Sequence, residues 1–476
     1  MTPGLDPESL HCDLLVIGAG MAGLSAAGYA AEHGATVIVV ERARSFGGSA
    51  LLSGGVLWTA TSPGRMRLYG GGASGLGAVV LQNYSPGLEW LRRRGVAMSQ
   101  AVSVLHGRGY QIDILDHLRG CAHLVEQHGG HVVLDTVTDS LLTDDKGRVI
   151  GARTVQGASH ATHERVREDR SGPTLSDPKV AQEEGFLDVH ARNVLLATGG
   201  YQNSPELREK FIHPNARDKL LLRTNPVSRG DGMRLAAAVG AEVRPTNGGF
   251  YGHLVSESPD WGDPRLYTLL TQYHSDRALL LNEAGLRFCD ESYGDHANTN
   301  HVVAQSNARA LCFWDANIHD TYATAPVVKG TEVIDKMKFA LERGGHGIIA
   351  TTVDEVGQFA TGQGFDGTQV CRTILEYNER CRHGWEQLAP IRSENCTALD
   401  KAPFYALVVR PAITHTHGGI RVDAAARVLA SDNAAVPGLF AAGSDIDGVY
   451  GVGYAGGLAM ALAFGIEAAR TMGFGG

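Results

Sequence analysis

A glycine-rich turn near the start of the chain, between an apolar and a small-residue segment, constrains the fold most strongly. Residues 14–17 form a short apolar run, and residues 18–23 follow at once with the spacing G-x-G-x-x-G. A second β-branched segment at 36–40 ends at Glu41, which lies 18 residues after the last glycine. This order of strand, turn, helix, strand and acid predicts a βαβ unit that binds a dinucleotide.

Each glycine of the turn has its own physical role. Gly18 allows the tight turn, Gly20 lets backbone N–H groups approach a pyrophosphate, and Gly23 permits close packing of helix on strand. The helix N-terminus places partial positive charge beside the phosphates. Glu41 can accept hydrogen bonds from an adenosine ribose.

The strand-then-glycine pattern returns twice, at residues 194–200 and 436–443. Between them, from about 241 to 353, the chain loses this rhythm and gains aromatic and histidine residues, as if a separate domain were inserted. We therefore predict an α/β fold with a Rossmann-like nucleotide-binding domain and an inserted α+β cap. The predicted boundaries are 1–240 for the first part of the nucleotide-binding domain, 241–354 for the cap and 355–476 for the C-terminal part.

Composition excludes several classes of function. The 476 residues include 42 basic and 51 acidic ones, and a net charge of -9 argues against a nucleic-acid partner. No run of about 18 apolar residues is present, so no membrane span is expected. The seven cysteines are scattered without a CxxC pair, which predicts reduced thiols in a cytoplasmic protein. Residues 156–184 are charge-dense and predict a surface loop of unassigned role.

The chain resembles the flavoprotein family of soluble fumarate reductases and 3-ketosteroid dehydrogenases. The matching motifs are 18–23, Glu41-Arg42, 47–49 with 53–55, 196–200, 230–232, 285–288 with Glu291, 415–419 and 438–443. The resemblance implies an FAD-binding domain of the glutathione-reductase type. It also implies non-covalent FAD, because the family's covalent histidine link has no counterpart around residues 51–58. A plain NAD enzyme is the alternative, but it would not need the segments at 197–200 and 438–443.

The expected FAD contacts lie in these glycine-rich segments. A serine-bearing segment after Glu41 suits backbone contact with the ribityl chain and the isoalloxazine ring, and in the family the last helix points its N-terminus at the flavin. The expected contacts are Gly18, Ala19, Gly20, Ala22, Gly23, Glu41, Arg42, Ala43, Gly48, Ser49, Ser53, Gly54, Gly55, Ala197, Thr198, Gly199, Gly200, Asp231, Gly443, Ser444, Asp445, Gly456 and Leu458.

The resemblance also bears on the substrate. Fumarate reductases hold a dicarboxylate with two arginines, and alignment places Tyr454 and His319 at those positions. Without the two guanidinium groups a dicarboxylate loses its bidentate clamp, so fumarate and succinate are disfavoured. Tyr454 instead matches the tyrosine that hydrogen-bonds the substrate carbonyl in ketosteroid dehydrogenases.

Removing hydrogen from the Cα–Cβ bond of a ketone requires an enolate-stabilising donor, a base and a hydride acceptor. Tyr454 is the expected donor, and flavin N5 the acceptor. The base is left open among Tyr293, which follows the motif that ends at Glu291, and the group Tyr251, His253 and His415.

We therefore expect a dehydrogenase that acts on an apolar, cyclic ketone and passes its electrons to an external acceptor. The alternatives are a reductase of an activated alkene and a flavin-binding sensor without catalysis. No metal is expected, because His415 and His417 lack a third ligand. Arg287 and Glu291 are expected to form a structural ion pair, and Trp58 and two tyrosines, Tyr251 and Tyr450, are candidates for a pocket wall.

Overall fold

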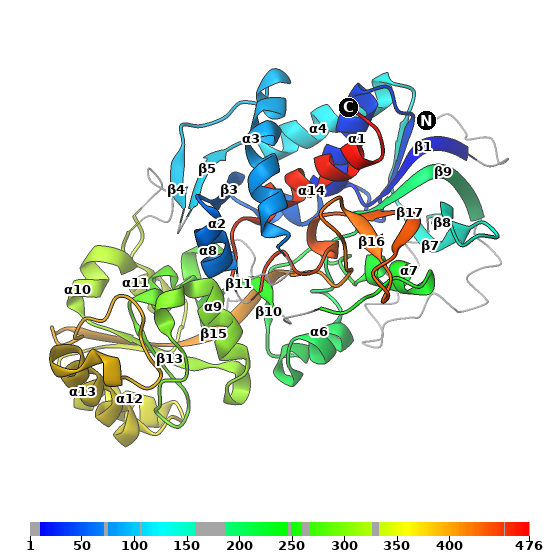
Figure 1. Cartoon of the computed structure of the whole chain (residues 1–476). Helices are drawn as coiled ribbons and strands as arrows, with labels where there is room; N and C mark the ends of the chain where they lie inside the picture. The colour runs from blue at the N-terminus through cyan, green and yellow to red at the C-terminus, as the bar shows by residue number, and fades with distance from the viewer. Residues whose placement is uncertain are drawn as a thin grey trace.

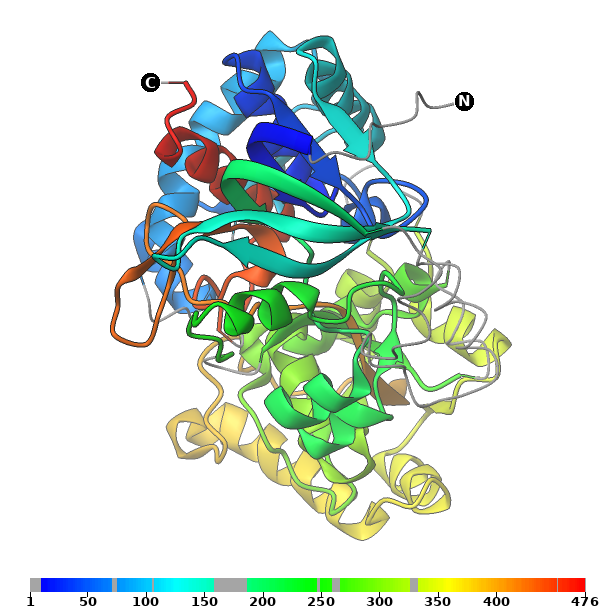
Figure 2. The ribbon, with the colours of Figure 1, turned by 90° about the vertical axis from the view of Figure 1, so that its right-hand side faces the viewer.

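The structure is a computed structural model that describes residues 10–70, 75–104, 107–157, 186–245, 249–258, 266–325, 333–451 and 453–475. The predicted surface loop at 156–184 therefore lies almost entirely outside the described residues. Two β-sheets form the centres of two lobes (Figure 1). In Figure 2 the blue and red segments, near the two ends of the chain, share one lobe, while the yellow segments and most of the green ones form the other.

The first sheet has the strand order β16-β17-β9-β1-β2-β6, with the hairpin β7–β8 joined to it through β9. Its central pairs β17–β9, β9–β1, β1–β2 and β2–β6 are parallel, as the βαβ pattern predicts. The strands are β1 (Leu10–Ile17), β2 (Val37–Val40), β6 (His131–Val133), β7 (Thr136–Thr143), β8 (Val149–Gln156), β9 (Phe186–Leu196), β16 (Arg427–Leu429) and β17 (Ala435–Ala441).

Helix α1 (Met21–Glu32) connects β1 to β2 and packs tightly because glycines leave no side chain between the elements. A Cβ atom on Gly23 would lie 1.9 Å from the Gly18 carbonyl oxygen, so the predicted close approach is present. Gly18 itself has φ +106°, a conformation that favours glycine. Helix α14 (Gly457–Thr471) packs beside α1, and α3 (Gly77–Arg93) and α4 (Ile114–Gln127) complete the same layer.

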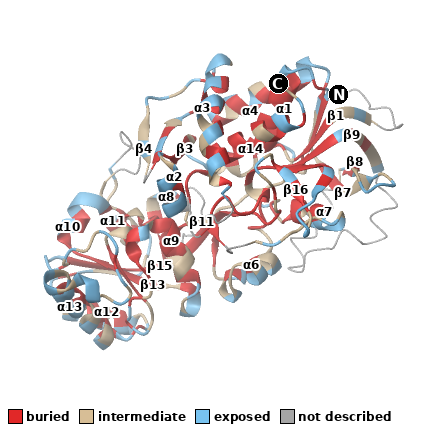
Figure 3. Ribbon diagram, in the orientation of Figure 1, coloured by how far each residue is buried: buried red, intermediate tan, exposed pale blue. Residues whose placement is uncertain are grey.

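The second sheet is built on one long strand, β15 (Phe404–Thr416). Its order is β10-β15-β13-β12, and β11 and β14 also pair with β15. The other strands are β10 (Leu221–Leu222), β11 (Phe250–Ser256), β12 (Leu279–Leu281), β13 (Ala310–Trp314) and β14 (Gly347–Ala350). Buried residues concentrate along β13, β15 and α14 (Figure 3).

The predicted end of the cap at residue 354 is too early. Helices α12 (Val353–Gly362) and α13 (Gly367–His383) supply Val356, Val370 and Ile374 to the hydrophobic core of the second sheet. The chain returns to the first sheet only after β15, because this apolar strand pairs with β11, β13 and β14 rather than with β9.

A third, antiparallel sheet borders the space between the lobes and consists of β3 (Val56–Ala60), β5 (Gly107–Gln111) and β4 (Val102–Val104). The remaining helices are α2 (Pro63–Arg65), α6 (Pro205–Phe211), α7 (Asp231–Ala238), α8 (Tyr267–Leu270), α9 (Asp295–Val303), α10 (Ala316–Ile318) and α11 (Lys336–Glu342). Within the described ranges, every helix is too short or too polar to cross a membrane.

Candidate active site

A cavity of about 610 Å³ lies where the two lobes meet, and both lobes contribute to its wall. The residues expected to contact FAD that line it are Gly20, Ala22, Glu41, Gly48, Ser49, Ser53, Gly54, Ala197, Thr198, Gly199, Gly443, Ser444 and Leu458. Gly18, Arg42 and Asp231 border a smaller adjoining cleft that also touches Glu41 and Thr198. The structure therefore gathers segments from three distant parts of the sequence around one elongated space.

The shape of this wall fits a large flat cofactor held by backbone atoms. A Cβ atom on Gly54 would meet nothing within 4 Å, and one on Gly48 would meet only the Asn225 amide at 3.5 Å and the Gly20 Cα at 3.9 Å. Gly20 is equally open, since its nearest neighbour would be the Gly47 carbonyl at 3.9 Å. These bare surfaces allow a ligand to approach the main chain closely.

Glu41 joins the two ends of the βαβ unit. Its carboxylate accepts hydrogen bonds from the backbone N–H groups of Ala19 and Ala43, each at 2.8 Å. Burial raises the pKa of Glu41, and the two N–H donors oppose that rise. Arg42 forms an ion pair with Asp231 at 3.0 Å, which ties β2 to α7.

Several residues expected at the cofactor lie behind the wall instead. Asp445 is buried and accepts hydrogen bonds from the backbone N–H (2.5 Å) and the hydroxyl (3.0 Å) of Thr198. Burial raises the pKa of Asp445 to about 7. Gly456 has no open face, because its Cβ would lie 1.8 Å from the Trp58 carbonyl oxygen. Ala19, Gly23, Ala43, Gly55 and Gly200 are likewise absent from the cavity lining.

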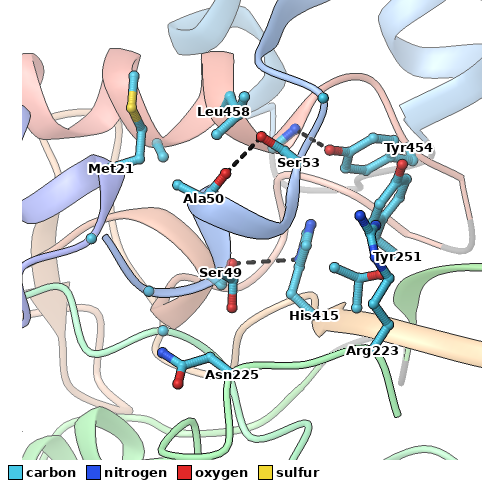
Figure 4. A pocket seen from close by; sticks show the side chains of 18 of the residues that line it. Met21, Ser49, Ala50, Ser53, Arg223, Asn225, Tyr251, His415, Tyr454 and Leu458 are labelled. Atoms are coloured by element: carbon cyan, nitrogen blue, oxygen red, sulfur yellow. Dashed lines mark hydrogen bonds between the residues drawn. The ribbon is translucent and has the colours of Figure 1, made fainter. Parts of the chain in front are cut away.

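Tyr454 reaches the cavity at the N-terminus of α14 (Figure 4). Its phenol oxygen accepts a hydrogen bond from the Gly457 N–H at 2.5 Å, which leaves the phenol hydrogen available for another acceptor. The Tyr454 ring lies 4.1 Å from that of Tyr251 and 5.6 Å from that of Trp58. Burial raises the pKa of Tyr454 well above its usual range, so the phenol is protonated and can donate.

Beside Tyr454 lies a hydrogen-bonded chain of three side chains. The Tyr251 hydroxyl lies 3.1 Å from Nε2 of His253, and Nδ1 of His253 contacts the Asp295 carboxylate. The other Asp295 oxygen accepts a hydrogen bond from the Leu254 N–H at 3.0 Å. Strand β11 supplies the first two residues, and Asp295 begins α9. The chain can therefore pass a proton between Tyr251 and His253 while Asp295 fixes the orientation of the imidazole.

The remaining histidines differ in their surroundings. His415 lines the cavity, and burial lowers its pKa to about 4, so its ring is neutral near pH 7. His417 does not line it and directs Nδ1 at the Gly451 carbonyl oxygen, at 2.9 Å. Among the described residues, His253, Asp295 and His296 form the one group whose ligand atoms are close enough for a metal ion. Within this group, His253 and Asp295 already bind each other.

Tyr293, a candidate base, and His319, which aligns with the second arginine of fumarate reductases, both lie away from the cavity. Tyr293 is 44% exposed and does not line the cavity, because the chain turns at Gly294 (φ +96°) and directs Asp295 inward instead. His319 stacks on Tyr405 inside the cap, with ring centroids 3.9 Å apart. Both positions lack access to the cavity.

A family model described as "FAD binding domain" matches residues 13–74 and 114–458 of the chain. The chain belongs to this FAD-binding family. FAD is therefore its cofactor, and the predicted fold class and the family suggested by the motifs are confirmed.

Individual members of this flavoprotein family are similar along nearly the whole chain. A probable fumarate reductase of Shewanella frigidimarina is 25% identical over an alignment of 477 positions, which covers 94% of this chain and 72% of the relative. A 4-oxocyclohexanecarboxylate 2-dehydrogenase of Sinomonas cyclohexanicum is 25% identical over an alignment of 571 positions, which covers 98% of this chain and 93% of the relative. A solved 3-ketosteroid Δ4-(5α)-dehydrogenase of Rhodococcus jostii shares the fold, with a TM-score of 0.69, 20% identity and coverage of 99% and 98%.

The flavoprotein's cavity also contains two cations that sequence reasoning missed. The Arg223 guanidinium lies 4.7 Å from the Tyr267 ring and donates to the Leu52 carbonyl oxygen. Lys336, 5% exposed, has its Nζ 5.4 Å from the Tyr273 ring. Burial lowers the pKa of Lys336. Across the described ranges, neither cation lies within ion-pair distance of a carboxylate.

Asp295 was missed as well, although it lies only four residues beyond Glu291 of the recognised motif. That motif has the predicted structural role, because Arg287 and Glu291 form a buried ion pair at 2.6 Å. Of the three aromatic candidates for the pocket wall, Trp58 and Tyr251 line the cavity. Tyr450 lies behind it and donates to the Gly456 carbonyl oxygen at 3.1 Å.

Proposed function

We propose that this flavoprotein dehydrogenates the Cα–Cβ bond of a cyclic ketone and forms the α,β-unsaturated ketone. The observation that carries the proposal is that Tyr454 and the Tyr251–His253–Asp295 chain lie side by side in the wall of one cavity. Tyr454 offers a hydrogen-bond donor and the chain offers a route for a proton, which are the two functions that enolisation requires. FAD, when bound, supplies the acceptor for the Cβ hydride.

Tyr454 is the donor to the ketone oxygen. Its phenol oxygen already accepts the Gly457 N–H, so its own hydrogen is directed toward an incoming acceptor. The N-terminus of α14 adds partial positive charge beside the same oxygen. As negative charge develops on the ketone oxygen, this pre-formed hydrogen bond strengthens and lowers the barrier.

Tyr251 is the base that receives the Cα proton. Its hydroxyl hydrogen passes to Nε2 of His253 as its oxygen takes the proton from carbon. The Asp295 carboxylate holds Nδ1–H of His253 and stabilises the imidazolium that results. The Arg223 charge opposes the burial-driven rise in the pKa of Tyr251, which favours its transient phenolate. His415, neutral near pH 7, is the second candidate for this role.

The two cavity cations favour a ketone that carries a carboxylate. Lys336 is buried and Arg223 is half-buried, and neither has a carboxylate partner among the described residues. A bound anion would lower the cost of holding these two charges in the cavity. The relative that acts on 4-oxocyclohexanecarboxylate supports a ring of this size. The argument against fumarate and succinate concerned only the two positions that align with the arginines of fumarate reductases. Arg223 lies elsewhere, in the segment after β10, and its guanidinium is proposed to bind the carboxylate of the ketone.

We propose that the electrons pass from the flavin to an external acceptor. A quinone-like compound or oxygen is the proposed partner. We also propose that FAD is held non-covalently, which acid precipitation tests by releasing yellow flavin into the supernatant.

An anaerobic titration tests the proposed reaction. The oxidised protein is mixed in turn with 4-oxocyclohexanecarboxylate, cyclohexanone, a 3-ketosteroid and succinate, and the flavin absorbance is followed. We expect the first compound to bleach the flavin at the lowest concentration and succinate to leave it unchanged. Bleaching by succinate alone would overturn the proposal.

The second candidate is the reverse reaction, reduction of an activated alkene. The similarity to a probable fumarate reductase favours it. Chemically reduced protein is mixed with 4-oxocyclohex-2-enecarboxylate without oxygen. Fast return of the flavin absorbance, with no bleaching by any saturated ketone, would assign the protein to reduction.

A further inference from the structure

Two of the seven cysteines, Cys381 and Cys396, lie side by side although 15 residues separate them in the chain. Their Sγ atoms are 3.0 Å apart, closer than the ~3.5–4.0 Å at which non-bonded heavy atoms make their best contact. Cys381 lies near the end of α13, and Cys396 lies in the segment between α13 and β15. Both are partly buried, so a small reagent can reach them.

The segment that carries Cys396, residues 384–403, is held down as a strap across the cap. Arg392 is fully buried and donates to the backbone oxygens of Ala278 (2.9 Å) and Asp276 (2.7 Å). Its guanidinium also lies 3.3 Å from the Glu291 carboxylate. On the other side, the side-chain amide of Asn378 in α13 donates to the Leu399 carbonyl oxygen (2.9 Å) and accepts from the Leu399 N–H (2.7 Å). Both anchors hold the two sulfur atoms together without a bond between them.

We propose that Cys381 and Cys396 form a reversible disulfide that clamps this strap to α13. This site is independent of the proposed function. The bond forms when one thiolate attacks glutathione disulfide and releases a glutathione thiol, after which the second cysteine displaces the other glutathione. Two cysteine thiols are oxidised and one glutathione disulfide is reduced to two thiols, so protons and electrons balance.

The clamp would act on the side of the cap that supports the catalytic segment. The strap contacts Asp290 through the Ser393 N–H (2.9 Å) and Ser292 through the Glu394 N–H (3.2 Å). Those residues lie five and three residues before Asp295 in the chain. A closed disulfide limits the freedom of the strap in the unfolded chain, so the oxidised form is expected to be the more stable one.

The test uses the full-length, FAD-loaded protein treated with glutathione disulfide and then with dithiothreitol. Thiols counted after denaturation should fall from the seven of the sequence to five and return to seven on reduction. Peptide mapping without reductant should recover one cross-linked pair, residue 381 with 396. Reduction should lower the melting temperature by roughly 3 °C.

Matched variants separate the clamp from general thiol chemistry. Cys371→Ser alters a partly buried cysteine of the same helix and should keep the cross-link and the melting shift. Cys381→Ser and Cys396→Ser should lose both while retaining the flavin spectrum. Seven free thiols after oxidation of the wild-type protein, or a cross-link between other cysteines, would overturn the proposal. The thiol count and the peptide map of the wild-type protein test the proposal even if a variant does not fold.

Discussion

Replacing Tyr454 by phenylalanine removes the hydrogen that the proposed reaction directs at the ketone oxygen. Loss of one donor to a developing oxyanion costs about 10²–10³ in rate. The structure favours the lower end, because the change also frees the Gly457 N–H, now 2.5 Å from the phenol oxygen, to bind the substrate. We therefore expect a decrease of about 10²-fold, ~2.7 kcal/mol of barrier, in the rate of flavin reduction.

The same substitution should also affect stability. A buried N–H that loses its partner costs about 1–3 kcal/mol of the free energy of unfolding. Tyr450→Phe is a matched control, because Tyr450 is buried beside Tyr454 and its hydroxyl bonds the Gly456 carbonyl behind the cavity wall. The control should lose comparable stability while keeping the wild-type rate.

Stopped-flow absorbance measures the rate of flavin bleaching by 4-oxocyclohexanecarboxylate under anaerobic conditions, at several ketone concentrations. The limiting rate reports the hydrogen-transfer step, and the half-saturating concentration reports binding. Both variants must first show a wild-type flavin spectrum. A wild-type limiting rate in the Tyr454 variant, or an equal decrease in the Tyr450 control, would refute the assigned role.

Three further predictions follow from other contacts of the site. Asp295→Asn removes the carboxylate that stabilises His253 as an imidazolium and should slow flavin reduction by about 10²–10⁴-fold; rapid-mixing kinetics with an unchanged rate would contradict the relay. Arg223→Gln should raise the half-saturating concentration of 4-oxocyclohexanecarboxylate at least ~10-fold and that of cyclohexanone much less, because only the former carries a carboxylate that can pair with Arg223. Equal effects on both ketones would exclude a carboxylate contact. Burial raises the pKa of Asp445 to about 7 in the folded protein, so the folded state binds more protons than the unfolded chain between pH ~4 and ~7. The free energy of unfolding should therefore fall as the pH rises through this range. Asp445→Asn should flatten this fall in melting temperature, and an unaltered pH dependence would show that the carboxyl ionises normally.

The sequence by itself determined the cofactor domain, because the signals for it are local. The positions of Gly18, Gly20 and Gly23 depend on turn geometry and helix packing within one βαβ unit. The role expected of Tyr454 came from the resemblance to ketosteroid dehydrogenases and stays a proposal, whereas its contact with α14 is local, since it lies three residues before that helix. Such short-range relations are visible as spacing in the chain.

Only the tertiary structure brought together the residues of the proposed catalytic site. His253, Asp295 and Arg223 come from three separate segments that meet because β11 and β10 both pair with β15 and α9 packs against β11. Lys336, at the start of α11, lines the same cavity. Nothing in the sequence spacing encodes such pairings. Tyr293 and Asp295 are only two positions apart, yet the turn at Gly294 leaves the Tyr293 side chain in solvent and directs the Asp295 side chain into the cavity.

The extent of the cap was decided in the same way. The pairing partners of β15, together with the apolar residues that α12 and α13 add to the same core, assign residues 355–416 to the second sheet. The contact between Cys381 and Cys396 likewise arises from the strap folding back onto α13. Short stretches of sequence determine local conformation, whereas long-range packing depends on all the apolar surfaces that compete for burial.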